Sequence, residues 1–168
     1  MRTNFATRMG DERMSQDVTT QFQRSIVHLL RRVDQRAAQL YTTESSDADL
    51  TLRQLAILTA ISQQQDSSQT DLVVMTGIDR STVAGIVSRL LGKGLLERRR
   101  SPDDGRAYCV RLSKRGVKAI AGADRIYSKI EKKLLSGLPA SEANQFVSTL
   151  KTLVAAQTSD ESQQSVQS

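Results

Sequence analysis

Seven basic side chains lie within 18 consecutive residues of the second half of the chain: Arg98, Arg99, Arg100, Arg106, Arg111, Lys114 and Arg115. Guanidinium groups bind phosphate through charge and paired hydrogen bonds. Pro and Gly in the segment SPDDGR, residues 101–106, indicate the loop of a hairpin. Arg106 falls near its tip beside Asp104, whose carboxylate can orient the guanidinium, and an arginine there suits the minor groove of DNA. We therefore predict a DNA-binding wing; a solvated charged surface is the alternative. The predicted wing residues are Arg98, Arg99, Arg100, Asp104 and Arg106.

A helix predicted over residues 80–92 carries small and polar side chains on one face and an apolar stripe on the other. Small side chains let a helix approach the floor of the major groove, where Ser, Thr and Arg can bond to bases or phosphates. Packing of another helix on this face is the alternative, and the adjacent arginines favour DNA. The apolar stripe is Val83, Ile86, Val87 and Leu90. The predicted DNA-reading face is Ser81, Ala84, Gly85, Ser88 and Arg89, with Thr82 at its edge and Arg80 as a phosphate contact in the first turn.

The residue types that other chemistries need are scarce. One His, one Cys and no carboxylates clustered at ligand spacing provide no nucleophile, cofactor or metal constellation, so we do not expect an enzyme. A net charge of +6 and a sequence pI of about 9.8 favour a polyanionic partner. Cys109 admits a redox-sensing alternative, because neighbouring arginines could lower the pKa of its thiol. A passive strand cysteine is the other interpretation.

Three helices are predicted to position the reading face. Apolar residues on more than one face predict a buried helix over 51–64. A short helix over 69–76 and the helix over 80–92 are joined by a tight turn, which is typical of a helix-turn-helix. The residues predicted to cap these helices are Ser68 with Asp71 in a capping box, Gly77 and Asp79.

The hairpin is predicted from two strands, over residues 95–100 and 107–112. Side chains alternate between the two faces of a strand. On the second strand we expect Tyr108, Val110 and Leu112 to point inward, and Ala107, Cys109 and Arg111 to point outward.

The outer helices carry a long apolar stripe. Steps of three and four residues predict one helix over 17–42, and a stripe of that length needs a partner surface of similar length, which favours a second subunit. Ser113 is predicted to cap a helix that continues to about residue 135, and a last helix follows the break at 136–139. The stripe comprises Val18, Phe22, Ile26, Leu29, Val33, Ala37 and Leu40.

Composition places these elements in one mainly α domain. Hydrophobic residues make up 38% of the chain and aromatic residues 4%, so the core consists mainly of aliphatic side chains that suit helix packing. We expect disordered tails over 1–16 and 158–168. The absence of a secretory signal, a membrane span and paired cysteines predicts a cytoplasmic protein.

The chain resembles a MarR-family transcriptional regulator. The segments LTLRQLAILTAI and IDRSTVAGIVSRLLGKGLLERRRSPDDGRAYCVRLSKRG carry the resemblance, which spans about residues 17–157. It implies a winged helix-turn-helix over 51–112, with a two-stranded β wing, and a helical dimerisation region formed by 17–42 and 113–157. Such proteins bind palindromic DNA as homodimers, usually repress nearby genes and often respond to a small ligand. The resemblance implies that Arg80, Ser81, Thr82, Ser88 and Arg89 face the major groove, and that Arg106 enters the minor groove. Ser101 replaces an Asp that often begins the wing loop.

A ligand site is predicted beside the first helix. His28 and Arg32 lie four residues apart on its flank, with Ser25 close by, and a cation there could hold the carboxylate of an aromatic acid or its CoA thioester. Arg53 is a further candidate. The alternative is that His28 and Arg32 only contact the edge of the core or bond across a dimer.

Two other functions use the same composition. A sequence-tolerant architectural DNA-binding protein needs the same positive charge, and it would bind random DNA as well as any operator. A protein-interaction module would bind no DNA even at low salt.

Overall fold

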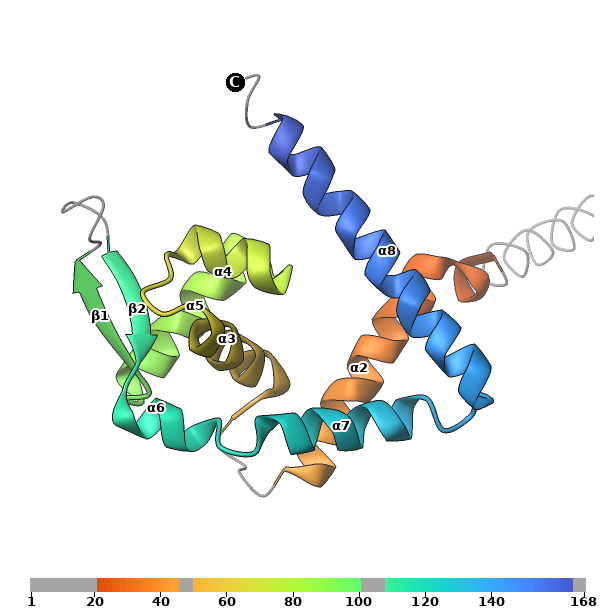
Figure 1. Cartoon of the computed structure of the whole chain (residues 1–168), viewed down its shortest axis with the longest axis horizontal. Helices are drawn as coiled ribbons and strands as arrows, with labels where there is room; N and C mark the ends of the chain where they lie inside the picture. Colours follow the sequence, from red (N-terminus) through yellow and green to blue (C-terminus); the bar gives the residue numbers. More distant parts are fainter. Residues whose placement is uncertain (1–20, 46–49, 101–107, 165–168) are drawn as a thin grey trace, which may run out of the picture.

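The computed structural model describes residues 21–45, 50–100 and 108–164, with side chains described as far as residue 156. It confirms the predicted mainly α fold with one antiparallel two-stranded sheet (Figure 1). No helix in these ranges is long and apolar enough to span a membrane. The elements are α2 (Ile26–Glu44), α3 (Leu52–Gln63), α4 (Gln69–Thr76), α5 (Arg80–Gly92), β1 (Leu96–Arg100), β2 (Tyr108–Leu112), α6 (Lys114–Ala119), α7 (Ala123–Leu134) and α8 (Ala140–Gln164).

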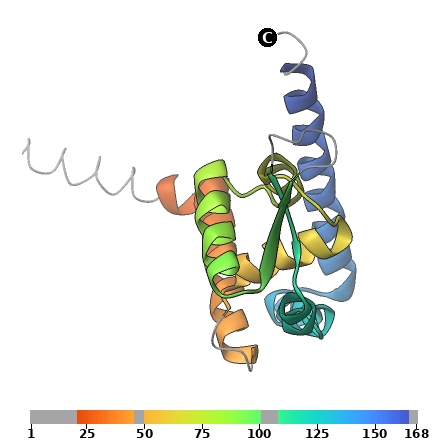
Figure 2. The same ribbon diagram turned by 90° about the vertical axis from the view of Figure 1, so that its left-hand side faces the viewer.

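The elements form two groups. Helices α3, α4 and α5 gather with the hairpin at one end of the molecule, and α2, α7 and α8 lie at the other (Figure 1). Seen from the first end, α5 stands beside the hairpin (Figure 2). Helices α6 and α7 run along one edge and connect the two groups. We call the first group, made of α3, α4, α5 and the hairpin, the lobe.

The core of the lobe is made of aliphatic side chains from its three helices. Leu58 and Ile61 of α3, Leu72 of α4 and Val83 and Leu90 of α5 have no exposed surface. Burial of such side chains from water is the main favourable contribution to folding. The predicted apolar stripe of α5 is confirmed, because Ile86 and Val87 are buried as well.

Side-chain caps fix the ends of the lobe helices. The predicted capping box is present: the Ser68 hydroxyl accepts from the Asp71 N–H at 3.1 Å, and the Asp71 carboxylate accepts from the Ser68 N–H at 2.7 Å. Gly77 ends α4 with φ of 65°, as predicted. A second capping box, between Thr51 and Gln54, opens α3 and was not predicted.

The hairpin confirms the predicted strands but corrects two side chains. Val110 and Leu112 are buried, whereas Tyr108, on the same face, is 49% exposed because it lies beyond the edge of the core. Cys109, predicted outward, is only 3% exposed. The α3–α4 connection pairs with the free edge of β2, where Ser67 forms two backbone hydrogen bonds with Val110, of 3.1 and 2.9 Å, and it brings the Asp66 carboxylate to 3.8 Å from the Cys109 Sγ.

Three predicted helix boundaries in the second group are wrong. Residues 21–24 are helical, but Ser25 is extended and interrupts the helix predicted over 17–42. Ser interrupts helices readily because its hydroxyl competes for backbone hydrogen bonds. The helix predicted to follow Ser113 breaks before Ala123, since Gly122 has φ of 88°. Helix α8 continues to Gln164, into the predicted tail after residue 157.

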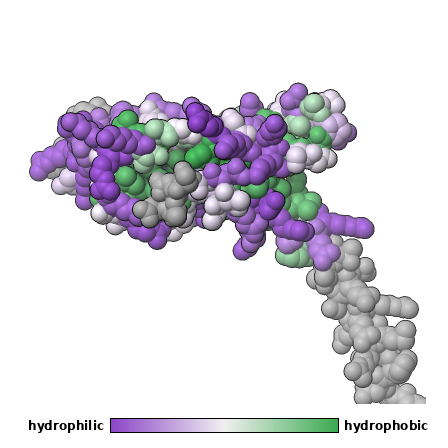
Figure 3. Space-filling view, turned by 90° about the horizontal axis from the view of Figure 1, so that it is seen from below, coloured by the Kyte–Doolittle hydropathy of each residue, from purple (hydrophilic) through white to green (hydrophobic). Residues whose placement is uncertain are grey.

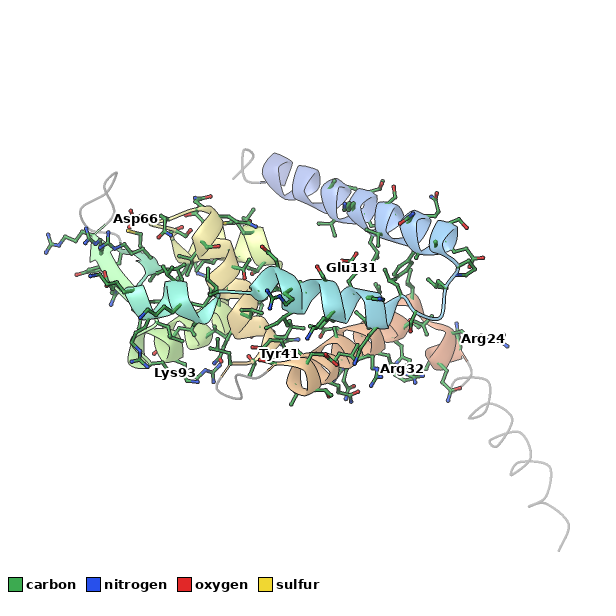
Figure 4. The ribbon with its side chains drawn as sticks, turned by 60° about the horizontal axis from the view of Figure 1, so that its bottom comes forward. Arg24, Arg32, Tyr41, Asp66, Lys93 and Glu131 are labelled. Atoms are coloured by element: carbon green, nitrogen blue, oxygen red, sulfur yellow. The ribbon has the colours of Figure 1, made fainter. Side chains whose placement is uncertain are left out.

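Helix α7 packs against the C-terminal part of α2, where Leu40 and Tyr41 are buried. Tyr41 lies where they meet and is 3% exposed (Figure 4), and Ile130 of α7 is 4% exposed. Glu44, at the end of α2, forms ion pairs with Lys133 and Lys129 of α7. The hydrogen bond from Lys133 and the charges of both lysines hold the pKa of Glu44 below its usual value.

Candidate nucleic-acid interface

Asp79 caps the start of α5 and also binds the hydroxyl of Ser81, one of the predicted DNA-contacting residues. An Asp79 carboxylate oxygen accepts from the Thr82 N–H at 2.9 Å and from the Ser81 hydroxyl at 2.6 Å. These hydrogen bonds lower the pKa of Asp79 well below the ordinary aspartate value. Because Ser81 donates its proton to Asp79, this hydroxyl presents lone pairs rather than a donor to a bound ligand.

The predicted reading face of α5 is a continuous surface strip. Arg80, Ser81, Ser88 and Arg89 are exposed, and the three remaining members, Thr82, Ala84 and Gly85, are partly exposed. Arg89 lies along the helix over Gly85: a Cβ built on Gly85 would be 3.7 Å from its Nη2. Because Gly85 has no side chain, the backbone of α5 can come close to a surface at this position, with the Arg89 guanidinium beside it.

The arginines of the hairpin divide between its two faces. Arg98 and Arg100 share a face with Tyr108, and Arg99 points to the opposite side. All three arginines are exposed. Arg111 lies on the same side as Arg99 and bonds to the Glu97 carboxylate at 3.2 and 3.3 Å, so its charge is partly compensated. Arg98 places its guanidinium carbon 3.9 Å from the centroid of the Tyr108 ring, which was not recognised in the sequence.

Asp104 and Arg106, the predicted tip of the wing, lie outside the described residues. The strands that lead to the tip are described on both sides. They pair in register from Leu96 opposite Leu112 to Arg100 opposite Tyr108. The hairpin therefore extends past the core and carries arginines outward from the lobe.

Two serines fix the hairpin to the lobe, Ser67 through its backbone and Ser113 through its hydroxyl, and neither was singled out as a positioning residue. Ser67 is fully buried and its backbone bonds to β2. Ser113 donates its hydroxyl proton to the Gly94 carbonyl at 2.7 Å and accepts from the Gly116 N–H at 3.0 Å. The second bond is the predicted cap of the following helix; the first joins that cap to the end of α5. No sequence pattern identifies Ser67, because its partner is distant in the chain.

The environment of Cys109 is unlike that of a reactive thiol, which is accessible and has a lowered pKa. Its Sγ lies 3.8 Å from the Asp66 carboxylate and 3.7 Å from the carbonyl oxygens of Arg99 and Arg100. Asp66 lies beside the hairpin in Figure 4. Burial and then the Asp66 charge raise the pKa of Cys109, and they outweigh the opposing effect of Arg99. The prediction of a lowered pKa for Cys109 is therefore wrong, although Arg99 alone acts in that direction.

The predicted ligand residues fall in two places. Ser25 and His28 are partly buried, and the centroid of the His28 ring lies 4.3 Å from that of the Phe22 ring, with the two planes tilted by 46°. Arg32 is exposed on the outside of α2 (Figure 4). Arg53 instead pairs with Asp34 at 3.3 Å. At 3.6 residues per turn, Asp34 lies on a different side of α2 from His28 and Arg32. The single chain therefore does not bring Arg53 to the His28 side chain.

One hollow of the surface is lined by residues of α8 and by Leu138 just before it, and by no residue of α2. Its lining is mainly apolar and includes one carboxylate, which disfavours an anionic ligand. The lining residues are Leu138, Glu142, Gln145, Phe146 and Thr149.

Comparisons with known proteins agree with this geometry. The family model described as MarR family matches residues 48–107. The chain is 30% identical to the HTH-type transcriptional repressor NicR of Pseudomonas putida, over 82% of this chain and 85% of that protein. Bordetella bronchiseptica BpsR, whose DNA binding is regulated by 6-hydroxynicotinic acid, superposes with a TM-score of 0.71 at 30% identity, over 79% of this chain and 94% of that one. The PcaV regulator of Streptomyces coelicolor, solved with its natural ligand, gives 0.70 at 30% identity, over 80% and 95%.

Proposed function

The chain belongs to the MarR family, whose members are DNA-binding transcriptional regulators and not enzymes, and from this premise we propose that it is a ligand-responsive repressor. It binds a palindromic operator as a homodimer and releases it when a small anionic aromatic compound binds. The single observation that carries the proposal is the exposed reading face of α5 beside a hairpin rich in arginine.

In this proposal α5 and the hairpin contact different parts of the DNA. The face of α5 enters the major groove, where Ser88 and Arg89 contact base edges and Arg80 contacts phosphate. Ser81, Thr82, Ala84 and Gly85 complete the surface that approaches the groove floor. The hairpin follows the adjacent minor groove with Arg106 at its tip, oriented by Asp104, while Arg98, Arg99 and Arg100 add positive charge along the stem.

Exposed apolar side chains support the homodimer. Residues of α2 and the turn before it are widely exposed, including Phe22 at 59%, Ile26 at 64% and Val27 at 73%. On α8, Leu153 and Val154 are 48% and 61% exposed. In Figure 3, hydrophobic side chains lie beside the point where the described chain begins and also between hydrophilic ones across the middle of the molecule. Such an area is costly in water, and a second copy would cover it.

The effector class is inferred from one similar protein and one side-chain pair. BpsR responds to 6-hydroxynicotinic acid, an aromatic carboxylic acid. In this chain Arg32 can supply a cation and His28 a hydrogen bond to such a carboxylate, with Ser25 nearby. A CoA thioester of an aromatic acid is the second form of this effector. Arg53 belongs to the site only if a ligand or the second subunit displaces Asp34.

The testing experiment is a mobility-shift assay on DNA directly upstream of the protein's own coding sequence. The proposal expects binding at least about 10³-fold tighter to one inverted repeat than to random DNA at the same salt. Equal binding to both would instead identify an architectural protein. Repeating the assay with aromatic acids and their CoA thioesters should find a compound that releases the operator. The same proposal places the protein in the cytoplasm, with the DNA.

A further inference from the structure

An aromatic ring holds one arginine of the hairpin stem. The Arg98 guanidinium lies 3.9 Å from the centroid of the Tyr108 ring. Tyr108 is paired with Arg100, so it lies diagonally across the strands from Arg98, within reach of a long side chain. The described residues contain no carboxylate at ion-pair distance from Arg98, whereas Arg111 on the opposite face is paired with Glu97. The ring therefore holds Arg98 in a defined position, and no described carboxylate compensates its charge.

The face that carries this pair is the one that leads toward α5. Leu96, Val110 and Leu112 lie on the same face of the hairpin and are buried in the lobe, where β1 contacts α5. Arg98 and Tyr108 continue this face past the edge of the core. A helix in the major groove and a wing in the neighbouring minor groove are separated by one sugar–phosphate strand. A cation between α5 and the wing tip consequently meets backbone phosphate.

We propose that Tyr108 is a positioning residue that holds Arg98 for contact with a DNA phosphate. A free arginine loses side-chain entropy when it binds, and a ring that restrains it beforehand reduces that loss. The ring leaves the N–H groups at the guanidinium edge available to phosphate oxygens, because cation–π contact uses only the flat face. This inference rests on the proposed DNA-binding function and adds a residue that reads no base.

The test is a double-mutant cycle on the upstream duplex used above. Tyr108→Leu removes the ring, Tyr108→Phe keeps it, and Arg98→Gln removes the cation. An exposed cation–π contact corresponds to about a two- to five-fold change in an equilibrium constant. Because a dimer carries two wings, the two effects multiply, and Tyr108→Leu should weaken DNA binding by roughly 4- to 25-fold. Tyr108→Phe should match the wild type.

The cycle separates positioning from a structural role. In the Arg98→Gln background, Tyr108→Leu should have no further effect, and Arg98→Gln should reduce the salt dependence of binding by about one phosphate per wing. Arg99→Gln is the matched control: it removes a neighbouring charge from the other face, and Tyr108→Leu should keep its full effect there.

Three outcomes would overturn the proposal. One is wild-type affinity of Tyr108→Leu; another is an equal loss from Tyr108→Leu with or without Arg98, which would assign the ring to hairpin stability. The third is a wild-type protein that binds no duplex at low salt, in which case the proposed function fails as well. The first two leave that function intact.

Discussion

Gly116 is the position where the smallest possible addition should do the most damage. It is buried at the start of α6, against the hairpin. A Cβ built there would lie 2.1 Å from the Leu95 carbonyl oxygen and 3.2 Å from a methyl of Leu112. The oxygen belongs to the backbone and accepts the Ser113 N–H at 3.0 Å, so it cannot rotate away as a side chain could. Gly116→Ala must push α6 and the hairpin base apart by about 1 Å.

The expected cost follows from those contacts. Overpacking costs about 1–3 kcal/mol, and weakening the Ser113 hydrogen bond adds about 0.5–1.5 kcal/mol. A loss of about 2–4 kcal/mol should lower the melting temperature by roughly 4–16 °C for a domain of this size. The wing base also shifts, so DNA binding should weaken at temperatures where the variant is still folded.

Gly92→Ala is the matched control. Gly92 lies in the last turn of α5, where a Cβ would have no neighbour within 4 Å. Ala is favoured over Gly in a helix, so this variant should gain about 0.5–1 kcal/mol. Circular dichroism melts at one fixed protomer concentration measure both changes. Equal melting temperatures for Gly116→Ala and the wild type would refute the packing argument, as would equal destabilisation by the two substitutions.

Three further predictions concern charge, the thiol and the DNA contacts. Folding lowers the pKa of Asp79, so the stabilising effect of its carboxylate is complete above the unfolded pKa of about 3.9 and is lost as pH falls toward the lower folded pKa. In urea titrations Asp79→Ala should therefore be less stable than the wild type at pH 7. The difference in stability should shrink below about pH 4. Iodoacetamide should label Cys109 slowly in the native protein and rapidly in urea, because the thiol is buried and its pKa is raised. In binding assays Arg106→Ala should weaken affinity most for sites with A·T-rich flanks, whereas Ser88→Ala or Arg89→Ala should change preference at a few base pairs by about 1–3 kcal/mol each.

Each of these has a clear contrary result. A constant stability difference between Asp79→Ala and the wild type from pH 7 to pH 3 would contradict the linkage. Native labelling of Cys109 as fast as labelling in urea would restore the redox alternative. Unchanged affinity of Arg106→Ala at physiological salt would remove this residue from the DNA interface.

The parts of the lobe that depend on local patterns were predictable from the sequence. Ser68 and Asp71 are three residues apart, and a capping box needs nothing beyond that spacing and a following helix. The stripe from Val83 to Leu90 repeats at helical steps, so one face of α5 had to be buried and the other exposed. The predicted reading face is the side of α5 that remains once the apolar stripe is assigned to the core.

The side chains that were predicted wrongly depend on distant parts of the chain. Alternation places Tyr108 and Val110 on one face but does not reveal where the core ends, and the core ends between them. Cys109 is buried by a connection more than 40 residues earlier, through Asp66 and Ser67. No spacing within the hairpin indicates that cover. The contact between Arg98 and Tyr108 depends on register, which the sequence does not establish exactly.

The break at Gly122 shows how an apolar period can hide a boundary. Ile120, Tyr127 and Ile130 recur at helical spacing across the break, which suggested one helix, although an isolated Gly in such a pattern is a warning. The two halves pack on different groups. Helix α6 is held against the hairpin base through Ser113. Helix α7 instead packs against the C-terminal part of α2 and is joined to its end by the Glu44 ion pairs. In the proposed dimer α2 carries the shared apolar surface, so the turn at Gly122 lies between the element that fixes the two copies and the element that carries the wing. The angle of that turn then helps to set the distance between the α5 reading faces of the two copies.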